Sequence, residues 1–249
     1  MIKSLNKNLL TLTIITQVFL LSGLTSNRKI LALSQEEVLQ KLAPITLFTI
    51  GNQKGDLIFI QTPNKPDVAL LYISQQQAQR AAQQLNQTKP GNSYQVIPVS
   101  LADMYKFFKE KSGQPNAPVL QLVPVQQEVE AAKGILSQQN QVVKDFPGVP
   151  LFYITYEQDK KEVFLTAKNG TENIIPLSFE KDFVQNQIQI AKQQQPDLAG
   201  TFKIRVMTLQ SLILLFEQKD NDGIRKMVVI PSQETIEFSR QLQQQQKSP

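Results

Sequence analysis

The side chains that most often perform chemistry in enzymes are scarce in this sequence. Its 249 residues include no cysteine and no histidine. Thiol catalysis, Ser-His-Asp chemistry and the usual zinc ligand sets are therefore excluded, and no disulfide can form. No pair of carboxylates lies near a predicted strand end with an acid/base partner, and Asp145, beside Phe146-Pro147, is interpreted as a loop cap. We expect no catalytic residue, no metal, no cofactor and no enzymatic activity.

Three kinds of segment imitate functional motifs without meeting their requirements. Gly51-Asn52-Gln53-Lys54-Gly55 lacks the spacing and the final Ser/Thr of a phosphate loop, so a hairpin turn is the better interpretation. Asp220-Asn221-Asp222-Gly223 resembles part of a calcium loop, but no glutamate stands at its twelfth position, and we interpret it as a turn. Asn86-Gln87-Thr88 and Asn169-Gly170-Thr171 match the glycosylation pattern only, and turn chemistry explains the second.

Composition and charge are those of an ordinary globular protein. Hydrophobic residues make up 41% and charged residues 19% of the chain, which is long enough to bury a substantial core. The formal net charge of +5 falls to +3 without Lys3 and Lys7, and to +1 without Arg28 and Lys29 as well. Because no basic stripe with interleaved aromatic residues follows, nucleic acid is not an expected partner.

The N-terminus has the pattern of a secretory signal. Lys3 and Lys7 precede an apolar run from Leu9 to Leu24, and no acidic residue occurs before Glu36. We favour export with cleavage, and we assign residues 1–32 to the signal. The alternative is an uncleaved anchor in the inner membrane, although the run is shorter than the about 20 apolar residues that a spanning helix prefers. A plastid transit peptide fits less well, because such peptides lack a compact apolar core.

The chain shows an approximate internal duplication. Segments of its first half recur in the same order about 104 to 108 residues later, which indicates one unit used twice. The matched segments are Ala43–Ile50 with Phe146–Thr155, Leu70–Ser74 with Ile175–Phe179, Lys89-Pro90 with Gln195-Pro196, Met104–Phe108 with Leu212–Phe216, and Gln121–Pro124 with Val228–Pro231.

Local patterns predict the elements of the first unit. Capping boxes at Ser34 and Ser74 begin two helices, and a third and a fourth follow at Ala102–Lys111 and around Val125, Val129, Ala132 and Leu136. The predicted strands are Ile45–Ile50, Leu57–Gln61, Val68–Ile73, Tyr94–Val99 and Val119–Val123.

The second unit is predicted to run in the same order. Asn169-Gly170 is a strong signal for a hairpin, which we expect to pair Glu162–Ala167 with Glu172–Leu177. The other predicted strands are Pro150–Tyr156, Phe202–Met207 and Lys226–Ile230. The predicted helices are one with Val184, Ile188 and Ala191 on its apolar face, Leu209–Phe216, and a glutamine-rich helix from Ser232 that fades at Gln243–Gln246.

These elements define an α+β fold. We expect two pseudo-symmetric β-β-β-α-β-α-β-α-like repeats packed together around one core and preceded by an N-terminal helix, because half of such a unit cannot cover its own sheet. The predicted organisation is a signal or anchor (1–32), a first repeat with the N-terminal helix (33–140) and a second repeat with a glutamine-rich tail (141–249).

Aromatic residues recur at matching places in the two units. Phe48 corresponds to Phe152, and Phe107 or Phe108 corresponds to Phe216; of these we take Phe48, Phe152, Phe108 and Phe216 as the four that matter. Large aromatic side chains at such places usually belong to the core. The functional alternative is that these four line shallow apolar grooves open to an extended polypeptide, and we take them as the candidate client-binding residues.

Four segments carry a resemblance to a known family. Leu47–Ile50, Val96–Leu101, Phe146–Thr155 and Ile175–Lys181 together resemble the family of the twenty-two-kilodalton component of the chloroplast inner-envelope translocon (the Tic family), over about residues 42–238. The resemblance implies a protein of the plastid intermembrane space or its cyanobacterial counterpart, with two pseudo-symmetric halves that bear apolar pockets. It also implies a chaperone-like role toward unfolded proteins and, in cyanobacteria, a link to outer-membrane biogenesis.

Residues and resemblance together give three functional hypotheses. The first is a chaperone-like factor of the cyanobacterial periplasm for protein translocation and outer-membrane protein biogenesis. Its partners would be unfolded precursors, above all outer-membrane barrel proteins, and the outer-membrane assembly machinery, with at most peripheral membrane association. The second is a membrane-anchored structural linker between translocation machineries, and the third is a carrier of a small apolar ligand. The thylakoid lumen and the inner membrane are the alternative locations.

The signal hypothesis makes a direct prediction. The mature protein should begin between Thr25 and Ser34 and should be released by osmotic shock, as measured by mass spectrometry of the intact protein. An intact Met1 in a carbonate-resistant membrane fraction would establish the anchored alternative.

Overall fold

The computed structural model describes residues 32–89, 93–141 and 143–245. The predicted signal or anchor lies outside these residues except for its last position, and so does the end of the glutamine-rich tail. The first half contains α1 (Gln35–Leu42), β1 (Thr46–Asn52), β2 (Phe59–Ile60), β3 (Val68–Tyr72), α2 (Gln75–Thr88), β4 (Tyr94–Ser100), α3 (Leu101–Lys111), β5 (Val119–Val123) and α4 (Gln126–Gln138). The second half contains β6 (Pro150–Gln158), β7 (Lys161–Phe164), β8 (Ala167–Asn169), β9 (Glu172–Ser178), α5 (Lys181–Gln194), η1 (Pro196–Leu198), β10 (Lys203–Thr208), α6 (Leu209–Gln218), α7 (Asp222–Lys226), β11 (Met227–Ile230) and α8 (Gln233–Gln245).

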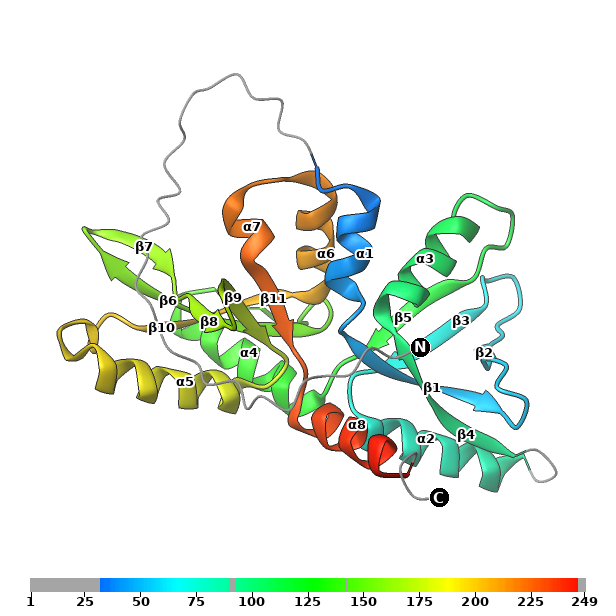
Figure 1. Cartoon of the computed structure of the whole chain (residues 1–249). Helices are drawn as coiled ribbons and strands as arrows, with labels where there is room; N and C mark the ends of the chain where they lie inside the picture. The colour runs from blue at the N-terminus through cyan, green and yellow to red at the C-terminus, as the bar shows by residue number, and fades with distance from the viewer. Residues whose placement is uncertain (1–31, 90–92, 142, 246–249) are drawn as a thin grey trace.

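The predicted α+β fold with two repeats is confirmed. One sheet has the order β2-β3-β1-β4 with β5 paired to β3, and the other has the order β10-β6-β9-β11 with β7 on β6 and β8 on β9 (Figure 1). The registers correspond as well as the order. Phe48 pairs with Tyr72 in the first sheet, and their counterparts Phe152 and Ser178 pair in the second.

The same correspondence holds at the parallel strands. Tyr72 pairs with Val123 in β5, and Ser178 pairs with Ile230 in β11. These registers make β9 the counterpart of β3 in the second repeat, at an offset of 106 residues (178 − 72). They make β11 the counterpart of β5, at an offset of 107 residues (230 − 123). The sequence matching had aligned Leu70 with Ile175, which is one residue short of the structural correspondence.

Local signals account for how several elements begin. Ser34 and Glu37 form the predicted capping box of α1, with both reciprocal hydrogen bonds present. At α2 only half of the predicted box forms, because the Gln77 side-chain amide donates to the Pro124 carbonyl oxygen instead. Before β6, Gly148 has a φ of +134°, and a Cβ there would lie 2.4 Å from the Gln210 side chain, which accepts the Val149 N–H. Glycine is therefore required at this position.

Two predictions about the second half are wrong in detail. The predicted hairpin partner Glu162–Ala167 is divided: β7 pairs with β6, and only the short β8 pairs with β9 across Asn169-Gly170. The segment from Asp220 to Gly223 is more than a turn, because the Asn221 side chain accepts the Ile224 N–H and begins α7. Both misses concern elements of five residues or fewer, whose type depends on their tertiary partner.

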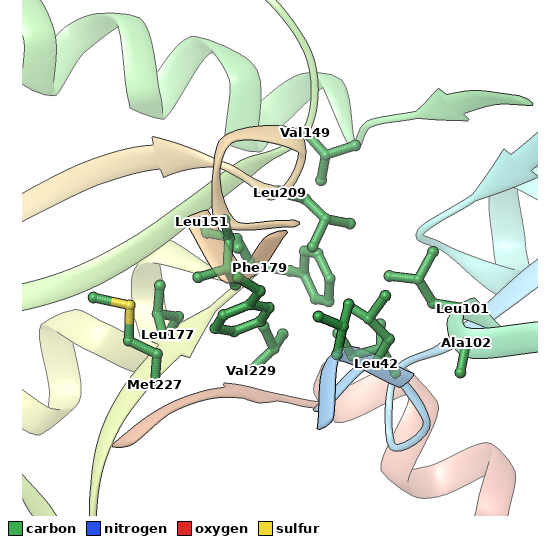
Figure 2. Close-up of a cluster of buried hydrophobic side chains, with 14 of the residues drawn as sticks. Leu42, Leu101, Ala102, Val149, Leu151, Leu177, Phe179, Leu209, Met227 and Val229 are labelled. Carbon is green, nitrogen blue, oxygen red and sulfur yellow. The ribbon is translucent and has the colours of Figure 1, made fainter. Parts of the chain in front are cut away.

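The core has one central and two large flanking parts. The central cluster joins both halves: Leu42 and Leu101 of the first half meet Leu151, Leu177 and other residues of the second (Figure 2). Phe48, Ile50, Tyr72, Ala78 and Ala82 form the flanking cluster of the first half. The flanking cluster of the second half contains Phe152, Ile154 and Tyr156 together with Val184 and Ile188 of α5.

The last helix of each half packs on the other half. Ala132 and Ile135 of α4 belong to the flanking cluster of the second half, where α4 contacts β6 and β10. In return, Phe238 of α8 packs in the flanking cluster of the first half, with its ring centroid 5.4 Å from that of Phe48. Because each half supplies part of the other's cover, neither could bury its own sheet alone. The apolar stripe of α4 contains Ile135 rather than the predicted Leu136.

Glutamates join helix N-termini where the halves meet. Glu128 of α4 accepts the Lys181 N–H at the start of α5 (3.0 Å), and Glu234 of α8 accepts the Gln76 N–H at the start of α2 (2.7 Å). Glu180 accepts the Gln233 N–H, the first of α8. Each bond places a carboxylate at the positive end of a helix dipole, which is stabilising.

Two of these glutamates are nevertheless perturbed unfavourably. Burial raises the pKa of Glu128, and the charges of Asp182 and Glu180 raise it further. The hydrogen bond from the Lys181 N–H lowers this pKa but does not cancel the rise. Burial also raises the pKa of Glu180, and the charges of Glu234 and Asp182 add to the rise. The hydrogen bond from the Gln233 N–H lowers this pKa but does not cancel the rise. The folded state therefore holds these protons at pH values where the unfolded chain, with its ordinary pKa near 4.5, has lost them.

This linkage predicts the sign of a pH effect. The contribution of the two groups to the free energy of unfolding should be greatest below pH 4.5 and should be lost as the pH rises through the raised folded pKa values. The double variant Glu128→Gln/Glu180→Gln should therefore gain stability relative to the wild type between pH 4.5 and pH 7, in urea unfolding followed by circular dichroism. Glu130→Gln, on the exposed side of α4, controls for the chemical change. A difference that is constant with pH, or of opposite sign, contradicts the assignment.

The halves also meet at α3 and α6. Lys109 Nζ lies 2.7 Å from Glu217 Oε1, and the Tyr105 hydroxyl hydrogen-bonds both groups. Lys109 and Glu217 occupy equivalent positions of the two helices, since Ser100 and Thr208, which cap them, are also 108 residues apart (208 − 100). The two equivalent positions face each other between the halves. Two lysines or two glutamates there would repel, whereas Lys109 and Glu217 attract.

A charge exchange tests this arrangement. Glu217→Lys should lower the free energy of unfolding by about 0.5–1 kcal/mol, since exposed pairs contribute roughly that much. Lys109→Glu should do the same, and the exchanged double variant should recover most of the loss, as measured by chemical denaturation. Losses that simply add in the double variant would show that the two residues do not interact.

Candidate functional site

An apolar groove lies on the first half, between α2 and the first sheet. Its volume is about 690 Å³. The floor comes from β1 and β3, one wall from the segment around β2, and the other wall from α2. The lining residues are Thr49, Ile50, Ile58, Phe59, Ile60, Gln61, Leu70, Tyr72, Ala81, Gln84, Leu85, Thr88 and Lys89.

The strand pairing explains why the floor is open. The paired register of β1 with β3 is limited to Phe48↔Tyr72, and β1 is then joined by the chain that leads into β2, through the Ile58 N–H to Ile50 O bond of 2.9 Å. β2 next pairs with the start of β3, Phe59 opposite Ala69. The sheet therefore curls around a branch point, while α2 packs mainly over β1 and β4. Because α2 contacts β3 less than it contacts β1 and β4, the β2–β3 side of this face is less covered.

An exposed apolar row extends the groove across the sheet. Ile60 of β2 pairs with Val68 of β3, and Val68 pairs with Val119 of β5, so the three side chains lie side by side. Ile60 is 48% exposed and Val119 is 44% exposed, and both belong to the few large hydrophobic residues that are open to solvent among the described residues. We call Ile60, Val68 and Val119 the apolar row. Adjacent apolar side chains of which two are open to solvent, with Val68 half-buried between them, are a candidate interaction site.

The polar groups of the groove carry almost no charge. Gln61, Gln84, Thr88 and Lys89 lie among its lining residues, and Lys89 alone of the lining residues is ionic. Thr49 is buried, and its hydroxyl donates to the Leu70 carbonyl oxygen at 2.9 Å, so it is fully occupied within the fold. Within the described parts of the chain, no group of three or more Asp or Glu residues could hold a metal ion. The groove is thus suited to apolar contact and offers no acid/base pair.

The corresponding face of the second half is filled. There Ala167 of β8 and Ile174 of β9 are both buried, and Phe183 of α5 packs over them. The counterpart of Phe183 in α2 is Gln77, at the same offset of 106 residues (183 − 77) that relates the starts of the two helices. Gln77 fills less apolar volume over the first sheet than Phe183 does over the second, although Gln77 itself is not among the residues that line the groove.

Three of the four predicted client-binding residues lie in the core. Phe48 and Phe152 are fully buried and Phe216 is 2% exposed, so none of them offers a surface in this conformation. Phe48 lies under Phe238, and the Phe216 ring lies under the Lys41 ammonium, 5.4 Å from its centroid. Phe108 is half-buried and stacks edge-to-face on Phe107 on the outer side of α3.

Ile60 and Val119 were not among the client-binding residues predicted from the sequence. Both were predicted inside ordinary strands, where alternation places every second side chain on a covered face. Which face of these strands stays uncovered depends on where α2 packs. The sequence does not predict that position, because residues 75–84 show only that the surface of α2 is rich in glutamine.

Fold and groove together define a class of protein: a duplicated α+β fold with interlocked halves and an open apolar groove on the first half. The model of the Tic22-like family matches residues 15–242, and the chain belongs to that family. The structure of Anabaena Tic22, titled as a protein of protein transport, is 25% identical and superposes with a TM-score of 0.73, over 84% of this chain and 97% of that one.

A more distant structure shares the fold. Tic22 from Plasmodium falciparum is 18% identical, with a TM-score of 0.60 over 83% of this chain and 97% of that chain. No match is found among curated proteins. Within residues 32–245, apart from the undescribed positions, no helix is both long and apolar enough to cross a membrane.

Proposed function

We propose that this protein takes part in protein translocation by holding apolar segments of unfolded precursor polypeptides in the groove of its first half. The observation that carries the proposal is the apolar row of Ile60, Val68 and Val119 beside an open groove. Membership of the Tic22-like family, and the protein-transport role given for Anabaena Tic22, support the same direction.

The shape of the site favours an extended client. An extended polypeptide presents an apolar side chain at every second residue, and these can enter the groove while the others face solvent. The outer edge of β5, next to Val119, can accept main-chain hydrogen bonds from such a segment. The prolines at both ends of β5, Pro118 and Pro124, keep this edge short, which limits pairing between copies of the protein itself.

The energetics favour weak and reversible holding. Each fully buried client side chain contributes roughly 1.5–3 kcal/mol of transfer free energy, from which the cost of ordering the client is subtracted. A groove that takes a few side chains therefore holds a precursor without trapping it. No phosphate-binding loop is present in the sequence, so holding should need no nucleotide.

The finer parts of the proposal come from the N-terminal signal and from the family. We propose a non-enzymatic chaperone-like factor in the cyanobacterial periplasm, with outer-membrane barrel precursors as clients and the outer-membrane assembly machinery as partner. One observation favours a second candidate function: the groove volume of about 690 Å³ falls in the range of small-molecule sites, as a carrier of an apolar ligand would require. Native mass spectrometry of the protein isolated from cells separates the two, because a carrier would retain its ligand.

The test uses two substitutions in the apolar row. Ile60→Glu/Val119→Glu should weaken binding of an unfolded barrel precursor by at least about tenfold, which corresponds to 1.4 kcal/mol. The measurements are fluorescence anisotropy of the labelled precursor and suppression of its aggregation without ATP. Ile190→Glu, at an exposed apolar position of α5 in the second half, is the matched control and should bind normally.

Circular dichroism must show that all variants fold. If the folded wild-type protein neither binds the precursor nor slows its aggregation, holding is excluded and the linker hypothesis moves ahead. If the double glutamate variant binds as well as Ile190→Glu does, the client site lies elsewhere on the molecule.

A further inference from the structure

Helix α8, next to the groove, is less buried than its counterpart in the other repeat. Helix α8 lies on the first half beside α2, as Figure 1 shows at the red end of the chain and as the Glu234–Gln76 hydrogen bond confirms. Its Phe238 packs against the cluster that contains Ile50 and Tyr72, and these two residues also line the groove. The contact between α8 and the first sheet therefore continues the groove floor as one apolar cluster.

The equivalent helix of the first half provides the comparison. Helices α4 and α8 begin 107 residues apart (233 − 126), the offset that also relates β5 to β11. Val129, Ala132 and Ile135 form the stripe of α4 that faces its sheet, and all three are buried. Their counterparts in α8 are Ile236, Ser239 and Leu242, and all three are only half-buried. The same face of the same structural element is thus sealed in one half and loosely covered in the other.

Several hydrogen bonds hold the beginning of α8. The Gln233 N–H donates to Glu180, Ser232 Oγ accepts the Thr235 N–H, and Glu234 accepts the Gln76 N–H. Beyond this first turn, the main apolar anchor is the Phe238 ring on Phe48. An outward movement of α8 would break this aromatic contact.

Removing α8 would enlarge the apolar surface of the groove. Phe48 and Tyr72 lie under or beside Phe238, and Tyr72 already lines the groove. Displacing the Phe238 ring would therefore lengthen the groove along α2 and bring Phe48 to its surface. The position that sequence reasoning assigned to client binding would then become accessible.

We infer that α8 is a displaceable latch, in which Phe238 occupies the inner end of the groove until an apolar client side chain takes its place. The inference rests on the proposed function, since it describes how that groove is regulated. It makes binding competitive with an intramolecular contact, so that the empty protein hides part of its apolar surface and closes again when the client leaves.

The first experiment needs no client. Amide hydrogen exchange of the full chain should be at least about tenfold faster in residues 236–244 of α8 than in the corresponding residues 129–137 of α4. Phe238→Ala should raise the binding of the apolar dye 1-anilinonaphthalene-8-sulfonate at least threefold, while Phe238→Leu, which keeps an apolar side chain in the floor, should give an intermediate value. Gln241→Ala, at an exposed position of the same helix, is the control.

The second experiment adds an unfolded barrel precursor. Saturating precursor should speed the exchange of α8 further, and Phe238→Ala should bind the precursor at least threefold more tightly than the wild type does. Thermal unfolding measured on the same samples shows that the variants are folded. The gain must also appear in Phe238→Leu to a smaller extent, so that a general loosening by the alanine is not mistaken for release of the latch.

The outcomes separate the latch from the proposed function. If α8 exchanges as slowly as α4, or Phe238→Ala binds no more dye than Gln241→Ala does, the latch is overturned even when the precursor binds at Ile60 and Val119. If α8 is fast and the dye binds more tightly but the precursor does not bind at all, the proposed client is wrong, and the latch stands as a property of the groove.

Discussion

The structure depends on the need of two sheets to be covered on both faces. The central strands β1 and β6 are buried along most of their length, so an apolar layer must lie above and below each. One layer is shared, because the inner faces of both sheets meet in the central cluster with α1, α3 and α6. The outer layers are completed by exchange, since α4 covers the second sheet and α8 lies on the first. The halves are therefore interdependent, and the duplication is a condition of folding.

A pseudo-symmetric frame makes the departures from symmetry informative. At the junction of α3 and α6, Lys109 faces Glu217 at equivalent positions, where two identical charges would repel. On the outer faces, Phe183 fills the second sheet while Gln77 stands at the matching place over the first. Each departure has a local physical reason, but they do not have the same consequence. The first adds one favourable contact between the halves, and the second leaves less apolar volume over the first sheet.

The groove fits a role in holding polypeptide better than a role in chemistry. Its lining is largely apolar, with Lys89 as the one ionic residue among those that line it. The carboxylates that are perturbed by burial, Glu128 and Glu180, lie where helices meet and already accept backbone N–H groups. A site that works by apolar contact alone gains little specificity, but it can accept many sequences and release them. The loosely seated α8 adds a way of hiding the most apolar part of that surface when the groove is empty.

Much of the local structure was determined by the sequence itself. The capping box at Ser34, the Asn169-Gly170 turn and the order of strands and helices depend on contacts within a few residues, and the duplication added long-range information because each unit checks the other. The tertiary structure alone decided which apolar residues are free. Phe48 and Ile60 both lie in apolar strand segments, yet one is covered by a helix from the other half and the other by none. Exposure depends on where distant helices come to rest, and no pattern within one segment specifies that.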